Sequence, residues 1–325
     1  MIELRNVSKR YEGQTQPAVN NLSMKINKGE ICVFVGPSGC GKSTTLRLMN
    51  RMIAPTSGGI YLNGTEVRSL CPDELRQGIG YVIQQIGLLP HKTVEENIAI
   101  VPRLHGWKKD KIKDRTRELV ERIGLDVDCD LKKYPSQLSG GQMQRVGVAR
   151  AMAVDPEIML MDEPFGAVDP IARCKLQDEF LKLQKTLKMT ICFVTHDIDE
   201  AIKMGDRIAI FNQGNIVQYD TPENILKWPV NDFVKDFIGS ERLLKSLGLT
   251  RLRDMKDLKV FKKREKLRFV LSGEATIQDA LSYMLENADE KLIVELKANT
   301  YASLSFRDIQ QYLKGSEGGS YYEVG

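Results

Sequence analysis

The most informative part of this chain reads Ile31-Cys32-Val33-Phe34-Val35-Gly36-Pro37-Ser38-Gly39-Cys40-Gly41-Lys42-Ser43. Its first five residues are apolar without alternation, which predicts a strand buried on both faces of a parallel sheet. The next eight follow the pattern G-x-x-x-x-G-K-S, and residues 44–50 after them favour a helix. A strand, a glycine-rich loop and a helix in that order predict a loop whose N–H groups and helix terminus bind phosphate.

This phosphate-binding loop carries a set of expected ligand contacts. Lys42 is expected to reach the β- and γ-phosphates of a nucleotide, and the Ser43 hydroxyl is expected to bind Mg²⁺. The glycines let the backbone wrap around a phosphate so that its N–H groups point inward. The nucleotide contacts are expected from Gly36, Pro37, Ser38, Gly39, Cys40, Gly41, Lys42, Ser43 and Thr44.

Two further apolar runs end in polar residues. Residues 158–161 precede Asp162 and Glu163, and residues 190–194 precede His196 after one threonine. In an open α/β fold, ligands bind at the carboxyl ends of the strands. We therefore expect Asp162 to bind Mg²⁺, Glu163 to polarise the attacking water as a general base, and His196 to contact the γ-phosphate. A solvated strand end and a structural histidine are the alternative interpretations.

The remaining segments indicate how these strands are embedded. Residues 2–11 and 21–26 are typical of short strands, and residues 60–67 predict a hairpin around an Asn-Gly turn. Residues 94–125 favour helices, with an amphipathic and highly charged stretch over 108–123. The sequence therefore predicts an α/β fold with an antiparallel β element at its start, a parallel core and a helical insert.

Composition excludes several classes of protein. Of 325 residues, 42% are hydrophobic and 28% are charged, which excludes collagenous, disordered and disulfide-scaffold chains. The formal net charge of +4 gives no reason to expect a nucleic-acid partner. No apolar run approaches the length of about 18 residues that spans a bilayer, so we expect any membrane role to be peripheral. The six cysteines form no C-x-x-C pair, which favours a reducing, cytosolic compartment.

A second glycine-opened helix start reads Leu138-Ser139-Gly140-Gly141-Gln142. It places a hydroxyl beside a helix N-terminus, which is a second anion-binding end on the same chain. In a head-to-tail pair, each such end could close the nucleotide site of the other chain.

The segment 138–142 is the ABC signature, and the chain resembles an ABC-transporter ATPase subunit over residues 1 to about 239. The resemblance implies a cassette with a mixed core sheet, an antiparallel β subdomain and a helical subdomain that carries the signature. It also implies a head-to-tail homodimer that closes on two ATP molecules. The signature contacts to ATP are then made by Ser139, Gly140, Gly141 and Gln142.

Further roles follow from the resemblance alone. Tyr11 corresponds to the aromatic residue that stacks on adenine, with a surface tyrosine on an edge strand as the alternative. Gln84 corresponds to the glutamine that touches Mg²⁺ or the attacking water and relays to the membrane subunit. Asp169 corresponds to the aspartate of the D-loop, and His196 to the switch histidine.

Two segments look like those of ATP-binding subunits that serve glycine betaine, carnitine and choline importers. They are residues 84–91 and 164–170. Such a subunit would lie at the cytoplasmic face of the cell membrane, bind integral-membrane permease subunits, and depend indirectly on an extracytoplasmic substrate-binding protein. The alternatives are an importer ATPase for a different small solute, a non-transport ABC ATPase of translation or DNA repair, and a regulatory nucleotide sensor.

The C-terminal part predicts a smaller domain. We expect a basic linker over 240–272, a single unit resembling a CBS repeat over 273–314, and a flexible tail over 315–325. The elements expected in the unit are a helix over 277–287, strands over 291–296 and 301–304, and a helix over 306–313. Because so short a unit is marginally stable alone, we expect it to pair with its counterpart or to dock on the cassette. The linker could follow an anionic membrane surface or be simply solvated.

Overall fold

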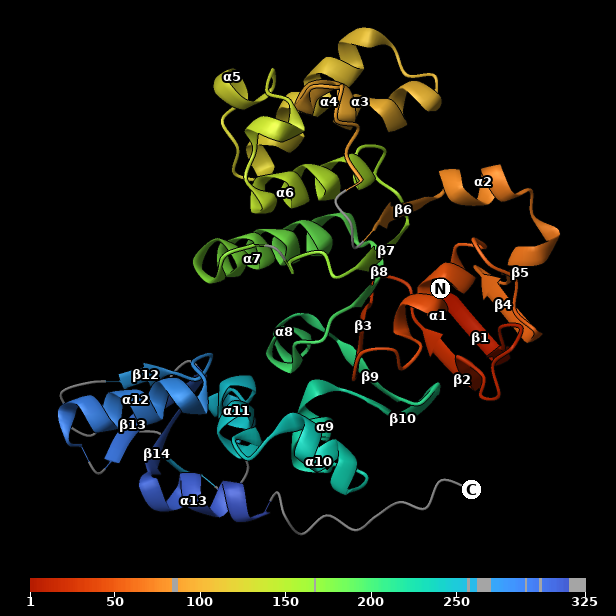
Figure 1. The fold of residues 1–325 in the computed structure, drawn as a ribbon. Coiled ribbons are helices and arrows are strands. Elements are labelled where there is room, and N and C mark those ends of the chain that lie inside the picture. The colour runs from red at the N-terminus through yellow and green to blue at the C-terminus, as the bar shows by residue number, and fades with distance from the viewer. Residues whose placement is uncertain are drawn as a thin grey trace. The chain divides into compact units, whose positions relative to one another are not determined.

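The computed structural model describes residues 1–83, 87–166, 168–255, 258–261, 270–289, 291–297 and 300–315. The chain divides into two compact units, Met1–Tyr219 and Asp220–Gly325 (Figure 1). Within the described ranges, none of the helices combines the length and the apolar character that crossing a membrane requires.

The first unit contains a six-stranded sheet with the order β10-β9-β3-β8-β7-β6. Its strands are β3 (Ile31–Val35), β6 (Ile79–Val82), β7 (Ile158–Asp162), β8 (Thr190–Val194), β9 (Arg207–Asn212) and β10 (Asn215–Asp220). The β3–β8, β7–β8, β3–β9 and β6–β7 pairs are parallel. Every residue of β3, β7 and β8 is buried, which confirms the prediction of three strands covered on both faces. Their carboxyl ends therefore share one edge.

A second, antiparallel sheet of this unit has the order β2-β1-β4-β5. Its strands are β1 (Ile2–Lys9), β2 (Val19–Ile26), β4 (Ser57–Leu62) and β5 (Thr65–Glu66). The expected hairpin turn is confirmed, because Asn63 and Gly64 have φ of 50° and 85°. One apolar cluster joins this sheet to β3 and to α1 (Lys42–Met49), through side chains such as Leu4, Phe34 and Leu46. This core fixes α1, and with it the phosphate-binding loop.

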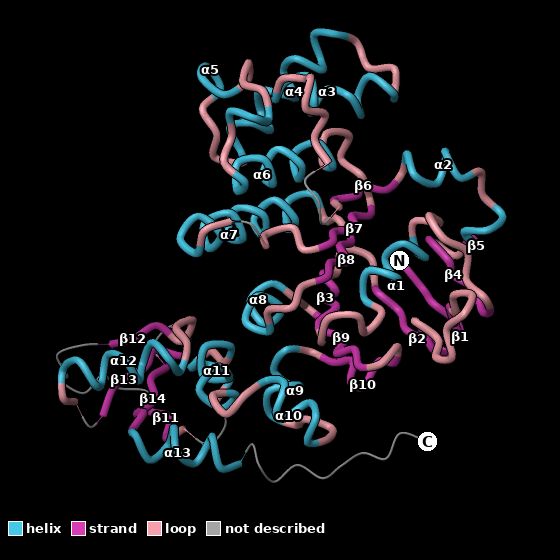
Figure 2. The backbone as a smooth tube through the Cα atoms, in the orientation of Figure 1, coloured by secondary structure: helices cyan, strands magenta, loops and turns pink. Residues whose placement is uncertain are grey.

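The helices of the first unit appear as cyan segments in Figure 2. They are α2 (Pro72–Gln77), α3 (Val94–Leu104), α4 (Lys109–Arg122), α5 (Val127–Asp130), α6 (Gly140–Ala151), α7 (Pro170–Leu187) and α8 (Ile198–Met204). The amphipathic helix expected within 108–123 is confirmed as α4, which buries Ile112, Leu119 and Val120. The helices α3 to α6 form the expected helical insert between β6 and β7.

The second unit combines helices with a four-stranded sheet of order β11-β14-β13-β12. Its elements are α9 (Pro222–Lys227), α10 (Asp232–Ile238), α11 (Arg242–Leu249), β11 (Lys259–Phe261), β12 (Val270–Ser272), α12 (Ile277–Asn287), β13 (Lys291–Lys297), β14 (Thr300–Ser305) and α13 (Phe306–Gly315). The expected helix, two strands and helix are all present as α12, β13, β14 and α13. Its apolar core includes Leu247, Ile277, Val294 and Leu304.

The structure differs from the expected linker over 240–272. Helix α11 lies inside that range, and Leu247, Leu252 and Met255 belong to the core of the second unit. The unit boundary also falls at 219/220 instead of 239/240. Of the basic residues in this range, Arg251 and Arg253 are exposed, and both pair with Glu274. Residues 256–257 and 262–269 of the expected linker, and 316–325 of the expected tail, lie outside the described residues.

Candidate functional site

The phosphate-binding loop runs from β3 into α1 along a tightly packed path. Gly36 and Gly41 have φ of 151° and 104°, in a region that favours glycine. A Cβ at Gly36 would lie 2.3 Å from the carbonyl oxygen of Phe211, and one at Gly41 would lie 2.3 Å from that of Ala18. Neighbouring main chain thus leaves no room for side chains at these two positions.

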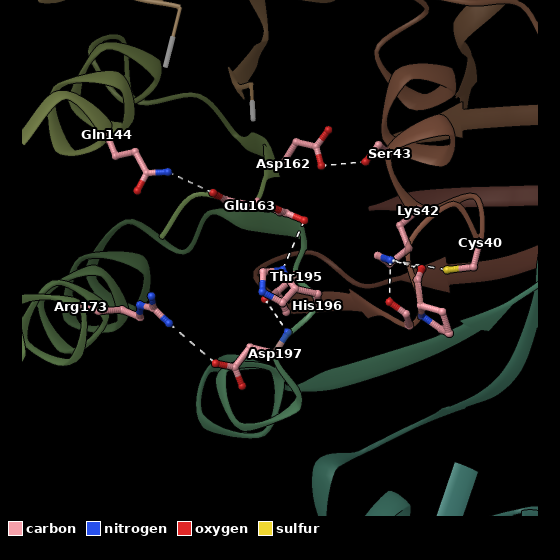
Figure 3. Close-up of polar contacts among 12 residues, drawn as sticks. Cys40, Lys42, Ser43, Gln144, Asp162, Glu163, Arg173, Thr195, His196 and Asp197 are labelled. Carbon is pink, nitrogen blue, oxygen red and sulfur yellow. Dashed lines mark hydrogen bonds and ion pairs between the residues drawn. The ribbon is translucent and has the colours of Figure 1, made fainter. Parts of the chain in front are cut away.

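Lys42 points into this loop (Figure 3). Its Nζ donates hydrogen bonds to the carbonyl oxygens of Gly36 and Pro37, over 2.7 Å and 2.8 Å, and lies 3.5 Å from Cys40 Sγ. The side chain is only 7% exposed. The loop therefore holds a positive charge at its centre, where a phosphate is expected.

Ser43 and Asp162 converge from α1 and β7. The Ser43 hydroxyl donates a hydrogen bond of 2.9 Å to Asp162 Oδ1. Burial raises the pKa of the Asp162 carboxyl, while the hydrogen bond from Ser43 acts in the opposite direction. Only 3% of Asp162 is exposed.

These two side chains fit Mg²⁺. A hydroxyl and a carboxylate are oxygen ligands, and Mg²⁺ commonly takes one or two protein oxygens and completes its shell with phosphate oxygens and water. Among the described residues, no group of three or more His, Cys, Asp or Glu side chains is arranged to hold a metal ion.

Glu163 and His196 extend the same edge of the sheet. The Glu163 backbone has φ of 50°, and its N–H donates to the Val194 carbonyl oxygen at 3.0 Å. Its carboxylate Oε1 lies 3.4 Å from Nδ1 of His196, which is 69% exposed. The structure therefore brings together a carboxylate and an imidazole next to the loop, as the sequence predicted. Such a pair can orient a water molecule and accept its proton.

The signature segment begins α6, as expected. Ser139 is the N-cap: its Oγ accepts a hydrogen bond of 3.2 Å from the Gln142 N–H, and Gln142 Oε1 accepts one of 2.9 Å from the Ser139 N–H. Gly140 and Gly141 are the first two residues of the helix. In this structure the Ser139 hydroxyl caps its own helix.

The other predicted residues lie as follows. Asp169 is the N-cap of α7 and accepts a hydrogen bond of 3.0 Å from the Ala172 N–H. Tyr11 follows β1 and is partly exposed, with Lys9 Nζ 5.2 Å from the centre of its ring. Thr44 lies in the first turn of α1, while Ser38 and Gly39 are exposed at the loop tip. Gln84 lies outside the described residues.

Sequence reasoning missed three residues around this site. Gln144 on α6 donates a 3.4 Å hydrogen bond to the Glu163 carbonyl oxygen. Arg150, at the other end of α6, donates one of 2.8 Å to the Gly87 carbonyl oxygen. Arg173 on α7 contacts the loop that follows β8. The sequence predicted a helix after residues 138–142, which carries Gln144 and Arg150, but nothing in it indicated which backbone atoms these three side chains would reach.

Comparison with known proteins agrees with this geometry. A family profile described as ABC transporter matches residues 19–166. The osmoprotectant import ATP-binding protein OsmV of Salmonella typhimurium is 52% identical over 79% of this chain and 68% of its own length. The glycine betaine/carnitine/choline transport ATP-binding protein OpuCA of Bacillus subtilis is 48% identical over 92% of this chain and 76% of its own. The solved dimeric structure of MJ0796, a bacterial ABC transporter cassette, superposes with a TM-score of 0.64 at 34% identity, covering 68% of this chain and 99% of that one.

Proposed function

This chain belongs to the ATP-binding subunits of ABC transporters, and we propose that it hydrolyses ATP to power the import of glycine betaine, carnitine, choline or a related quaternary amine. The observation that best supports ATP hydrolysis is the hydrogen bond between Ser43 and Asp162. The Glu163–His196 pair lies at the same edge of the sheet. The names of the two relatives, one for osmoprotectants and one for these three amines, support the substrate class.

Binding of the triphosphate would begin at Lys42. Its Nζ now donates to loop carbonyl oxygens, and it would exchange them for oxygens of the β- and γ-phosphates. The N–H groups of the loop and the N-terminus of α1 would bind the same anion. Ser43 and Asp162 would hold Mg²⁺, which when bound neutralises charge on the phosphate oxygens.

Hydrolysis would use the carboxylate of Glu163. It accepts a proton from the attacking water, and His196 orients the γ-phosphate from the neighbouring strand end. The left-handed backbone of Glu163 and its hydrogen bond to Val194 hold this carboxylate at the sheet edge. Electrostatic stabilisation of the transferred phosphoryl group then falls to Lys42.

We expect the chain to work as a head-to-tail homodimer. Ser139, Gly140, Gly141 and Gln142 of one copy would close on the ATP bound to the loop of the other. Tyr11 would stack on adenine, Gln84 would touch Mg²⁺ or the water, and Asp169, the D-loop aspartate, would contribute to the ATP site. The dimeric MJ0796 cassette supports a dimer for this chain.

The assembly would lie at the cytoplasmic face of the cell membrane. We expect it to bind integral-membrane permease subunits and to depend on an extracytoplasmic substrate-binding protein, with no nucleic acid involved. The likeness of residues 273–314 to a CBS repeat stays a prediction.

The test is ATP hydrolysis by the chain assembled with its membrane subunits in liposomes. Each candidate amine is added with its binding protein, and we expect one of them to stimulate turnover. Glu163→Gln should lower turnover at least about 100-fold, because general base catalysis contributes factors of this size.

The matched control is Glu157→Gln. Glu157 is an exposed carboxylate before the opposite end of β7, where its Oε2 accepts a hydrogen bond of 3.3 Å from Asn63 Nδ2. This variant should keep the parent's turnover. Equal turnover in Glu163→Gln and the parent would refute the assigned base, whereas hydrolysis indifferent to every amine would refute the substrate class.

A further inference from the structure

A small polar cavity of about 30 Å³ is lined in part by Glu163 and His196. It is enclosed by the turn after β7, the loop after β8, and the first turns of α7 and α8. Its polar lining consists of Glu163, Arg173, Thr195, His196, Asp197 and Glu200. Arg173 and Asp197 have no role in the proposed mechanism of ATP hydrolysis.

Arg173 joins two loops across this cavity. Its Nη2 donates a hydrogen bond of 3.0 Å to the carbonyl oxygen of Val168, the residue before Asp169. Its Nη1 lies 3.8 Å from Asp197 Oδ2, and Figure 3 shows the side chain reaching from α7 toward that carboxylate. One guanidinium thus connects the D-loop to the residue that follows His196.

Asp197 is itself fixed to the backbone around His196. Its Oδ1 caps α8, accepting hydrogen bonds from the N–H groups of Asp199 and Glu200 at 2.9 Å and 3.3 Å. Its own N–H donates to Thr195 Oγ1 at 3.1 Å. The carboxylate is thus held to the start of α8, after His196, and the main chain of Asp197 is held to Thr195, before His196.

We propose that Arg173 is a positioning residue that ties the position of His196, and so its distance from Glu163, to the position of the D-loop. This inference rests on the proposed ATPase function. Arg173 touches neither the nucleotide nor the water; it acts through Asp197. The link makes the alignment of His196 with Glu163 depend on the position of the chain just before Asp169.

An arginine suits this task because its planar fork offers two Nη groups to two acceptors. Arg173 Nε has no hydrogen-bond partner among the described residues, so the two Nη atoms make both connections. A lysine could reach the Val168 carbonyl oxygen or the Asp197 carboxylate, but not hold both in a fixed geometry. Arg173→Lys should therefore restore turnover only in part.

Lys203 provides a matched control. Its Nζ joins the same two helices, since it lies 2.8 Å from Asp178 Oδ1 and donates a 3.3 Å hydrogen bond to the Cys174 carbonyl oxygen, both on α7. Lys203→Met removes a bridge between α7 and α8 without altering a contact to Val168 or Asp197.

The experiment measures kcat, KM for ATP and the urea unfolding midpoint of the full chain. We expect Arg173→Met to lower kcat about tenfold, below the roughly 100-fold that a 1 Å misplacement can cause, with KM changed less than twofold. Lys203→Met should keep the parent's kcat. Asp197→Asn, which retains the helix cap, should lower kcat like Arg173→Met and carries the same test if the methionine variant fails to fold.

A double-mutant cycle gives the decisive comparison. If Arg173 acts through Asp197, adding Arg173→Met to Asp197→Asn should lower kcat by less than twofold more. If the two variants lower kcat independently, so that their fold-losses multiply, the inference is overturned. Equal losses of kcat in Arg173→Met and Lys203→Met would also overturn it, and neither result would affect the proposed ATPase function. A parent chain without ATPase activity, or an unimpaired Glu163→Gln, would instead overturn the proposed function on which it rests.

Discussion

Gly41 lies where the phosphate-binding loop enters α1, and its conformation serves two purposes. Its φ of 104° turns the chain into the helix, and the absence of a side chain lets the loop pass the main chain at Ala18. Gly39 in the same loop also has a positive φ, of 74°, but a Cβ added there would meet no atom within 4 Å. A side chain at Gly39 would therefore cost stability only through its backbone conformation, whereas one at Gly41 would also cost stability through close packing.

Gly41→Ala should destabilise the chain more than Gly39→Ala. The second change costs about 1–2 kcal/mol, the usual penalty of a left-handed residue with a Cβ. The first adds an overlap with a carbonyl oxygen 2.3 Å away, and overpacking of this kind costs about 1–3 kcal/mol more. Urea unfolding of both variants measures the difference. Equal midpoints would mean that the loop moves away from Ala18 without cost.

At the scale of elements, two helices of the first unit begin with the same cap. Thr93 and Glu96 form a capping box at α3, and Ser139 and Gln142 form one at α6. In both, the hydroxyl accepts from the third N–H of the helix and the longer side chain accepts from the N-cap N–H. The two caps should therefore contribute similarly to the free energy of unfolding. Only the cap at α6 belongs to the signature segment.

Ser139→Ala and Thr93→Ala should each lower the free energy of unfolding by about 1 kcal/mol, the typical value of a lost cap. Only Ser139→Ala should also lower ATP turnover, by tenfold or more, or about 1.4 kcal/mol of activation free energy. Chemical unfolding and steady-state hydrolysis, measured on the same preparations, check both parts. A similar loss of turnover in Thr93→Ala would attribute the effect to helix stability instead of the signature.

Elements that depend on local pattern were predictable from the sequence. The apolar runs in β3, β7 and β8 predicted buried parallel strands, and the structure confirms them. The polar residues that follow these strands lie at one edge of the sheet, as expected. The contacts of Arg173 were not predictable, because they depend on how closely α7 approaches the loop after β8. The left-handed φ of Glu163 was not predictable either, because the apolar run before it indicates a strand but not how the chain turns where that strand ends.

At the scale of the molecule, each of the two units has an apolar cluster of its own among the described residues. One includes Leu4, Phe34 and Leu46 of the first unit, and the other includes Ile277 and Met284 of the second. Helices α9 and α10, expected from resemblance to belong to the cassette, fall in the second unit. There the Leu226 carbonyl oxygen accepts a 2.9 Å hydrogen bond from Arg242 Nη1, a long-range contact that the local pattern did not indicate.

Each unit also contains one of the chain's two tryptophans, which makes the independence of the cores testable. Trp107 lies in the first unit and Trp228 in the second. The Trp228→Phe background therefore reports unfolding of the first unit by fluorescence, and Trp107→Phe reports unfolding of the second. Both measurements use the full chain.

Met284→Ala should shift only the transition reported by Trp228. Met284 is fully buried on α12, and removing a buried side chain of this size costs about 2–5 kcal/mol. The transition reported by Trp107 and the affinity for ATP should remain those of the parent, because the phosphate-binding loop draws its support from the other core. A matching shift of both transitions would show that the two units unfold as one cooperative body, and the C-terminal unit would then contribute to the stability of the ATP site itself.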